Sequence, residues 1–105
     1  SIQTLNMEEN NIPKSFRLGN AYPNPFNPNT TIQYGLSNME FVTIEIFDLM
    51  GRKIKSLVNQ KLDPGNYSSN WDATDNMNQP VAGGMYIYHM QAGDFKETKK
   101  LSLIK

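Results

Sequence analysis

The chain has 105 residues, with ten basic and ten acidic side chains, one histidine and no cysteine. The length suits a single domain, and the balanced charge argues against a nucleic-acid-binding protein, which normally carries a basic excess on one face. The missing cysteines exclude disulfides and sulfur-ligated zinc. No apolar run reaches the length of about 18 residues that a membrane-spanning helix needs, so no membrane insertion is expected.

Residues 1–15 are polar and show no sustained periodicity, so we expect a linker or flexible arm from a parent protein. The chain begins with Ser rather than Met, which indicates an excised piece of a longer protein, so the lack of a secretory signal pattern says little about that parent protein. The predicted domain occupies residues 16–105.

Residues 21–29, AYPNPFNPN, follow the first predicted strand and hold three of the six prolines. Proline fixes its own backbone, pushes the preceding residue toward an extended shape and lacks the donor for strand pairing. We therefore expect a stiff plug where the linker meets the domain. Tyr22 and Phe26 are expected to pin the plug to the end of the domain. Asn24 and Asn27 are expected to bond nearby backbone groups.

Segments rich in β-branched and aromatic residues alternate with turn signals through the rest of the chain, without helical periodicity. In residues 41–48, Val42, Ile44 and Ile46 share one face while polar residues alternate with them. The pattern predicts an all-β fold, an immunoglobulin-like antiparallel β-sandwich of about seven strands. The strands are expected near residues 16–20, 30–36, 41–48, 53–59, 65–71, 84–91 and 95–104.

The polar loop at residues 72–80 indicates a crossover between the two sheets. It carries four side-chain oxygen donors of the kind that calcium prefers: Asp72, Asp75, Asn76 and Asn78. Their spacing does not match the EF-hand pattern, and Asp and Asn commonly stabilise turns by themselves. The four residues are weak calcium candidates, and no cofactor is expected.

Aromatic side chains could form a platform for sugar, but rings in small β domains more often fill the core. The candidates are Tyr22, Phe26, Tyr34, Tyr67, Trp71, Tyr86 and Tyr88. His89 is expected on the strand surface, facing away from Tyr88. The chain has no G-x-S-x-G nucleophile elbow, and its acids are scattered, so no catalytic residue is predicted.

The last ten residues contain four lysines against one acid: Lys96, Lys99, Lys100 and Lys105 against Glu97. Such charges can protect an edge strand from aggregation. They can also mark a terminus that a partner reads by adding a strand. Alternation would turn Leu101 and Leu103 toward the core. An exposed edge also leaves room for a weak homodimer.

Four blocks of the chain, in this order, resemble the type A C-terminal sorting domain of the type IX secretion system, also called the Por secretion system sorting domain. They are YPNPFNPNTTIQYGL, VTIEIFDLMGRKIKSLV, GNYSSNWDATD and PVAGGMYIYHMQAGDFKETKKLSLIK. The resemblance covers about residues 18–105, and the blocks are more distantly similar to the immunoglobulin-like module of the flagellar hook-capping protein. Ala73, where glycine is common, and Gly83 depart from the family pattern and bear on loop geometry.

The resemblance implies a non-catalytic signal domain. It would direct a parent cargo protein, joined in cis, from the periplasm through the type IX translocon to the cell surface or exterior. A sortase usually removes such a domain, and the linker before Leu18 resembles the region of cleavage. The implied sorting-signal residues are Lys99, Lys100, Leu101, Leu103, Ile104 and Lys105.

Other functions remain open from the residues alone. The main alternative is a carbohydrate-binding or adhesive module of a larger extracellular enzyme, which exposed coplanar rings would favour. A mechanical spacer is a further reading, and it would be indifferent to its position in the parent protein. An enzyme would need converging titratable groups.

Overall fold

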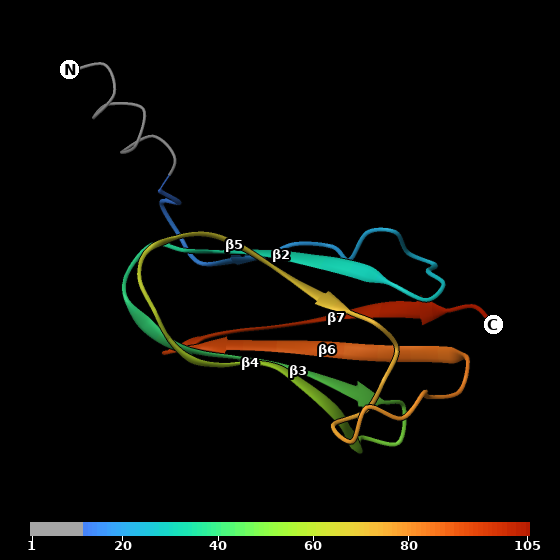
Figure 1. Ribbon diagram of the computed structural model, residues 1–105. Coiled ribbons are helices and arrows are strands. Elements are labelled where there is room, and N and C mark those ends of the chain that lie inside the picture. Colours follow the sequence, from blue (N-terminus) through green and yellow to red (C-terminus); the bar gives the residue numbers. More distant parts are fainter. Residues whose placement is uncertain (1–11) are drawn as a thin grey trace.

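The computed structural model describes residues 12–105, which form two antiparallel sheets packed face to face (Figure 1). The predicted all-β sandwich is confirmed, with seven strands in this described part: β1 (Arg17–Leu18), β2 (Thr30–Leu36), β3 (Glu40–Asp48), β4 (Lys53–Leu62), β5 (Gly65–Trp71), β6 (Gly84–Ala92) and β7 (Phe95–Leu103). One sheet has the order β1-β2-β5 and the other the order β4-β3-β6-β7. The predicted crossover after β5 is confirmed, because β5 and β6 lie in different sheets.

The fourth strand lies beside the third, whereas constant-type immunoglobulin domains place it in the other sheet. The tight turn between β3 and β4 explains this pairing. The Asp48 carboxylate accepts hydrogen bonds from the amides of Met50 and Arg52, both at 2.9 Å, and Gly51 adopts a φ of 85°. The Arg52 amide is the main cause of a lowered pKa at Asp48. A carboxylate held this way favours a β3–β4 hairpin over a connection to the opposite sheet.

Alternation along the strands builds the core. Val42, Ile44 and Ile46 of β3 are fully buried, and Leu101 and Leu103 of β7 are nearly so. Buried residues of β2, β5 and β6 meet them from both sheets: Ile32, Tyr34, Leu36, Trp71, Tyr86, Tyr88, Met90 and Ala92. The period-two pattern thus predicted the inner faces correctly.

Two strands, β1 and β4, differ from the expectation by more than one residue at an end. β1 has only two residues, although the Gly19 amide still donates to the Gln33 carbonyl at 2.7 Å before the chain leaves the sheet. β4 runs on to Leu62 because β3 already begins at Glu40, which pairs with Leu62. Of the predicted arm, residues 1–11 lie outside the described residues. The described residues contain no helix long and apolar enough to cross a membrane.

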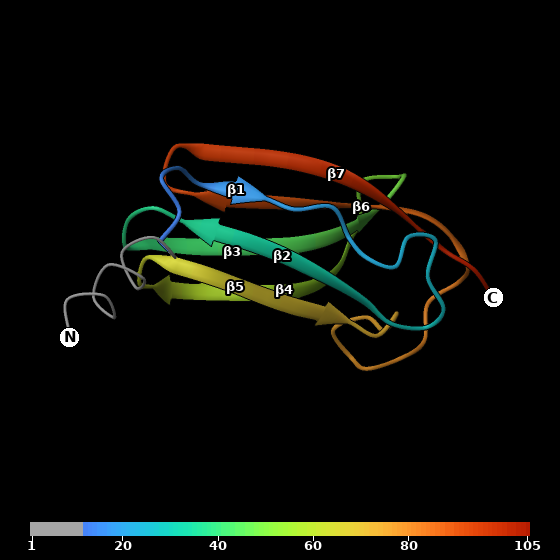
Figure 2. The ribbon, with the colours of Figure 1, turned by 90° about the horizontal axis from the view of Figure 1, so that it is seen from above.

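The described chain starts at one end of the sandwich and its C-terminus lies at the other (Figure 1). Residues 21–29, the β3–β4 turn and the crossover loop gather at the C-terminal end, and the view from above shows the same arrangement (Figure 2). The segments that the sequence singled out therefore lie at the same end of the sandwich as the C-terminus.

Candidate functional site

The terminal strand β7 is an edge strand of the four-stranded sheet, paired on one side with β6. Leu101 and Leu103 point into the core, as expected, with exposed fractions of 1% and 2%. Lys100 and Lys105 are exposed, and Ile104 is 54% exposed. Lys99 is half-buried and lies 3.3 Å from the Glu97 carboxylate. The predicted signal residues thus divide into core anchors and displayed side chains.

The proline segment, residues 21–29, covers the last part of the free edge of β7. The Asn24 side chain accepts the Ser102 amide at 2.9 Å and donates to the Lys100 carbonyl at 3.3 Å. The Phe26 amide donates to the Ser102 carbonyl, and the Ile104 amide donates to the Phe26 carbonyl, both at 2.9 Å. Asn24 therefore bonds groups more than 70 residues away, although the sequence predicts nearby partners.

Phe26 holds the proline segment to the body, as predicted. Its ring is 2% exposed and lies 5.5 Å from the centre of the Trp71 ring. The prediction that Tyr22 pins the segment is wrong, because its side chain is 80% exposed. Tyr22 contributes its backbone instead, exchanging two hydrogen bonds of 2.9 Å with Thr31. A tyrosine at this position keeps its ring outside because the extended backbone turns alternate side chains away from the core.

The Tyr88 hydroxyl holds the entrance to the proline segment, a role that the sequence does not reveal. It accepts the Ala21 amide at 2.8 Å and donates to the Gly19 carbonyl at 2.7 Å. Burial raises the pKa of this hydroxyl, which therefore stays protonated and keeps both bonds. The sequence pattern identifies Tyr88 only as a core residue of a strand. No local sequence signal shows that its hydroxyl also anchors residues 19–21.

We predict that Asn24→Ala loosens the end of β7 without unfolding the domain. The substitution removes two hydrogen bonds at an exposed site, which is worth on the order of 1 kcal/mol of local stability. Hydrogen exchange at the Ser102 and Ile104 amides should accelerate about tenfold. Asn27→Ala, in the same segment and also exposed, is the matched control. Equal hydrogen-exchange rates in the two variants would show that the Asn24 side chain does not hold the end of β7.

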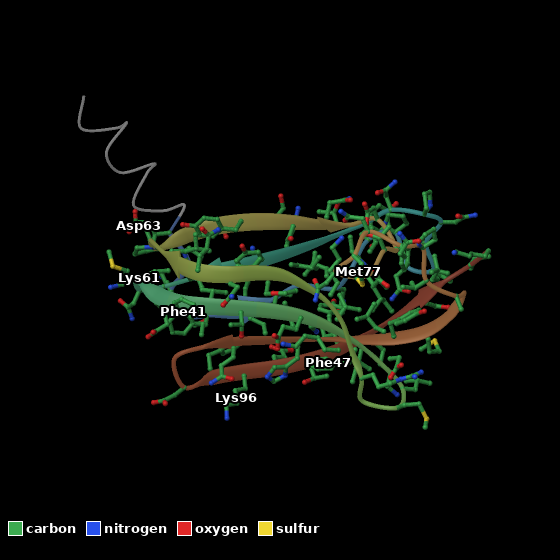
Figure 3. All side chains as sticks on the ribbon, turned by 60° about the horizontal axis from the view of Figure 1, so that its bottom comes forward. Phe41, Phe47, Lys61, Asp63, Met77 and Lys96 are labelled. Atoms are coloured by element: carbon green, nitrogen blue, oxygen red, sulfur yellow. The ribbon has the colours of Figure 1, made fainter. Side chains whose placement is uncertain are left out.

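The outer face of the four-stranded sheet carries lysines and two aromatic rings. Phe41, Phe47 and Lys96 project from it, with Lys61 beside Phe41 (Figure 3). His89 lies on this face, as predicted, and its Nδ1 is 2.8 Å from the Thr98 hydroxyl oxygen. A hollow of about 340 Å³ adjoins Phe41, with Glu40, Thr43, Gln91 and Gly93 around it.

The rings considered as a sugar platform are mostly core residues. Phe26, Tyr34, Trp71, Tyr86 and Tyr88 are buried, and Tyr67 is partly buried and stacks on Tyr34 at 5.5 Å. The core interpretation is confirmed for these six. Tyr22 is exposed and is the remaining member of the set, so these seven rings do not form a coplanar platform.

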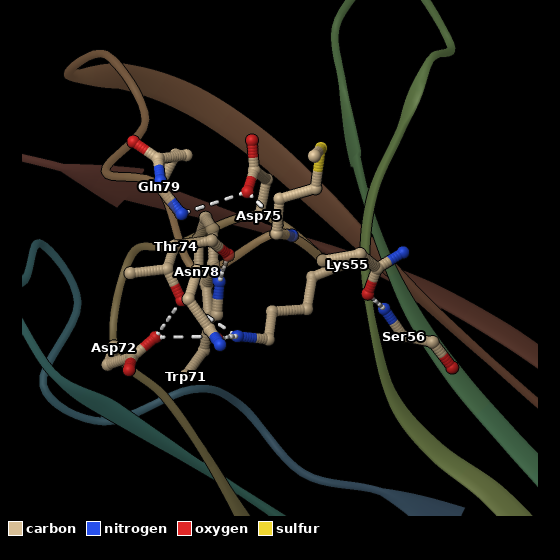
Figure 4. A network of polar contacts seen from close by, with 10 residues as sticks. Lys55, Ser56, Trp71, Asp72, Thr74, Asp75, Asn78 and Gln79 are labelled. Atoms are coloured by element: carbon tan, nitrogen blue, oxygen red, sulfur yellow. Dashed lines mark hydrogen bonds and ion pairs between the residues drawn. The ribbon is translucent and has the colours of Figure 1, made fainter.

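The four calcium candidates take part in a loop network around Lys55 (Figure 4). The Lys55 ammonium lies 2.7 Å from the Thr74 hydroxyl, 3.4 Å from Asn78 Oδ1 and 3.8 Å from Asp72 Oδ1. The Thr74 hydroxyl, followed by Lys55, lowers the pKa of Asp72. A positive charge already sits where Asp72 and Asn78 point, which disfavours a second cation there.

The other two candidates stabilise the same loop from different positions. Asp75 Oδ1 accepts the amides of Met77 and Gln79 at 2.9 and 3.0 Å, and Asn76 Oδ1 accepts the Ser56 amide at 3.0 Å. Within residues 12–105, no three His, Asp or Glu side chains gather closely enough to hold a metal ion. Calcium binding stays a prediction of the sequence, and the geometry assigns these residues a structural role.

Most of the chain matches a known protein family. A model of the family described as "Secretion system C-terminal sorting domain" matches residues 20–105. No curated protein matches the chain. Among solved structures, dimeric latent PorU from Porphyromonas gingivalis has a TM-score of 0.67 and 21% identity, over 81% of this chain and 9% of that one.

Two further structures share the fold. PorZ, a surface component of the type-IX secretion system of Porphyromonas gingivalis, has a TM-score of 0.56 and 16% identity, over 86% of this chain and 11% of that one. The hook-capping protein FlgD from Xanthomonas campestris has a TM-score of 0.55 and 24% identity, over 87% of this chain and 63% of that one. The chain thus spans about a tenth of the two Porphyromonas proteins. Because the family model covers residues 20–105, the chain belongs to the secretion system C-terminal sorting domains, the sorting domains of the type IX secretion system.

Proposed function

We propose that the chain is a non-catalytic signal domain that directs a cargo protein, joined to it in cis, from the periplasm through the type IX translocon. Membership of the family implies export to the cell surface or the extracellular space. The proposal adds passage through the periplasm, recognition by translocon components and removal by a sortase.

The observation that carries the proposal is the placement of the terminal strand. β7 is an edge strand, and its end lies at the opposite pole from the point where the described chain enters (Figure 1). A partner can therefore bind the terminal residues without meeting a cargo attached at the other end. Lys100, Ile104 and Lys105 present side chains for that contact, while Leu101 and Leu103 hold the strand in register from the core.

The proposed cleavage lies in the segment before the body of the domain. Phe16 packs on Phe95 with ring centres 5.9 Å apart, which fixes the chain there. Just before it, Lys14 and Ser15 are exposed and belong to no strand. Exposed chain without ladder hydrogen bonds is the kind of backbone that proteases accept.

A fusion experiment tests the proposal. Residues 1–105 are attached to the C-terminus of a reporter that ordinary export delivers to the periplasm, in a cell with a working type IX system. The reporter should reach the cell surface or medium, with a mass reduced by loss of the domain. The same fusion in a cell without the translocon is the control. Retention of the intact fusion in the periplasm of competent cells would refute the proposed function.

A further inference from the structure

The free edge of β7 has two parts with different availability. Asn24 and Phe26 bond the Lys100 carbonyl, both backbone groups of Ser102 and the Ile104 amide. In an antiparallel strand, both backbone groups of a residue point to the same side, and every second residue repeats that direction. The backbone groups of Lys96 and Thr98, and the Lys100 amide, therefore face away from β6, as those of Ser102 do. On the side away from β6, no backbone hydrogen bond joins residues 96–100 to another described residue, and β7 is the outermost strand on that side (Figure 2).

The open stretch, residues 96–100, is long enough for strand addition. It spans roughly 13 Å at about 3.3 Å per residue, close to the length of a short natural strand. The edge beyond it is closed by the proline segment, so an added strand would align with residues 96–100 and not with the extreme C-terminus. A strand added to this edge would therefore lie upstream of the terminal residues that the sequence alone points to.

The charges on residues 96–100 indicate which kind of partner segment would fit this edge. Lys96 and Lys100 are exposed on the outer face, two residues either side of Thr98, and no acid among the described residues forms an ion pair with them. Lys99 lies on the other face and is paired with Glu97. An added strand would place its own side chains directly opposite these positions.

We propose that residues 96–100 bind an extended segment of a secretion partner that carries acidic side chains four residues apart, with an uncharged residue between them opposite Thr98. This inference rests on the proposed sorting function and names the chemistry of its partner. Backbone hydrogen bonds supply the contact and the two ion pairs set the register. A second copy of this edge fits poorly, because antiparallel pairing about Thr98 would place Lys96 of one copy opposite Lys100 of the other.

Proline at position 98 tests the backbone part of the proposal. Thr98→Pro removes an amide that faces away from β6, so it leaves the β6–β7 ladder intact, and proline is tolerated on edge strands. Thr98→Val is the matched control: it also loses the hydroxyl contact to His89 but keeps the amide. In the reporter fusion, Thr98→Pro should lower surface delivery about tenfold relative to Thr98→Val.

Charge reversal tests the same site without touching the backbone. K96E/K100E should lower delivery by a similar factor, whereas K53E/K61E, which changes the net charge equally on β4, should not. Thermal unfolding of each purified chain checks that the variants fold. Equal delivery within either pair would overturn the inference.

The outcomes separate the inference from the proposed function. If the unmodified fusion is not delivered, the sorting function itself fails. If the unmodified fusion is delivered, and the two variants of either pair are delivered equally, the docking edge is wrong and the sorting function stands. A dimer of the native chain that K96E/K100E dissociates, measured by sedimentation, would assign the edge to a second copy and overturn the proposed occupant.

Discussion

Trp71→Ala is expected to lower the free energy of unfolding by about 3–5 kcal/mol. Trp71 is fully buried, and its ring lies 5.5 Å from Phe26 and 5.2 Å from Tyr86. Its indole nitrogen donates to the Thr74 carbonyl at 2.9 Å, so the substitution also leaves a loop carbonyl without its partner. The loss is a large share of the stability of a small domain, which is typically about 5–15 kcal/mol.

The effect should extend to the terminal strand. Trp71 supports Phe26, and Phe26 bonds the edge of β7 at Ser102 and Ile104. Urea unfolding should show a lower midpoint with an unchanged slope. Tyr22→Ala, at an 80% exposed ring in the same region, should stay within about 0.5 kcal/mol of the native chain. A Trp71→Ala chain as stable as Tyr22→Ala would contradict the packing described for this end of the sandwich.

The inner faces of the sheets could be predicted because they depend on a local pattern. Alternation identified Val42, Ile44 and Ile46 as core residues, and the turn signals between the predicted strands placed a short connection between β3 and β4. Both are properties of a few consecutive residues, which the sequence displays directly.

The contacts that define the site could not be predicted in this way. Asn24 meets Ser102 across 78 residues, and nothing in either segment alone marks the pair. The sequence pattern around Lys55 indicates an exposed lysine on a strand. However, the register between β3 and β4 shifts between Ile44 and Glu45 and again between Ile46 and Phe47. The Lys55 side chain meets the crossover loop instead. Such contacts depend on how the sheets stack, which is a property of the whole fold.

Deletion of the terminal residues affects the core of the domain as well as its displayed end. Removing residues 100–105 from a cargo fusion is expected to abolish surface delivery, but chiefly by unfolding the domain. Leu101 and Leu103 are 1% and 2% exposed, and each buried leucine is worth about 2–5 kcal/mol. The six-residue deletion therefore cannot distinguish a lost signal from a lost fold.

Removing only Ile104 and Lys105 separates loss of the signal from loss of the fold. Both side chains are exposed, and the deletion takes away one hydrogen bond, from the Ile104 amide to the Phe26 carbonyl. The melting temperature should fall by only a few degrees, since about 1 kcal/mol corresponds to roughly 4–8 °C for a domain of this size. If the terminal pair is read by the translocon, as proposed, delivery should fall about tenfold or more, beyond what so small a loss of stability explains. Asn24→Ala, which loosens the same edge but keeps the terminus, is the matched control and should be delivered. Full delivery of the two-residue deletion would show that the partner does not read Ile104 and Lys105.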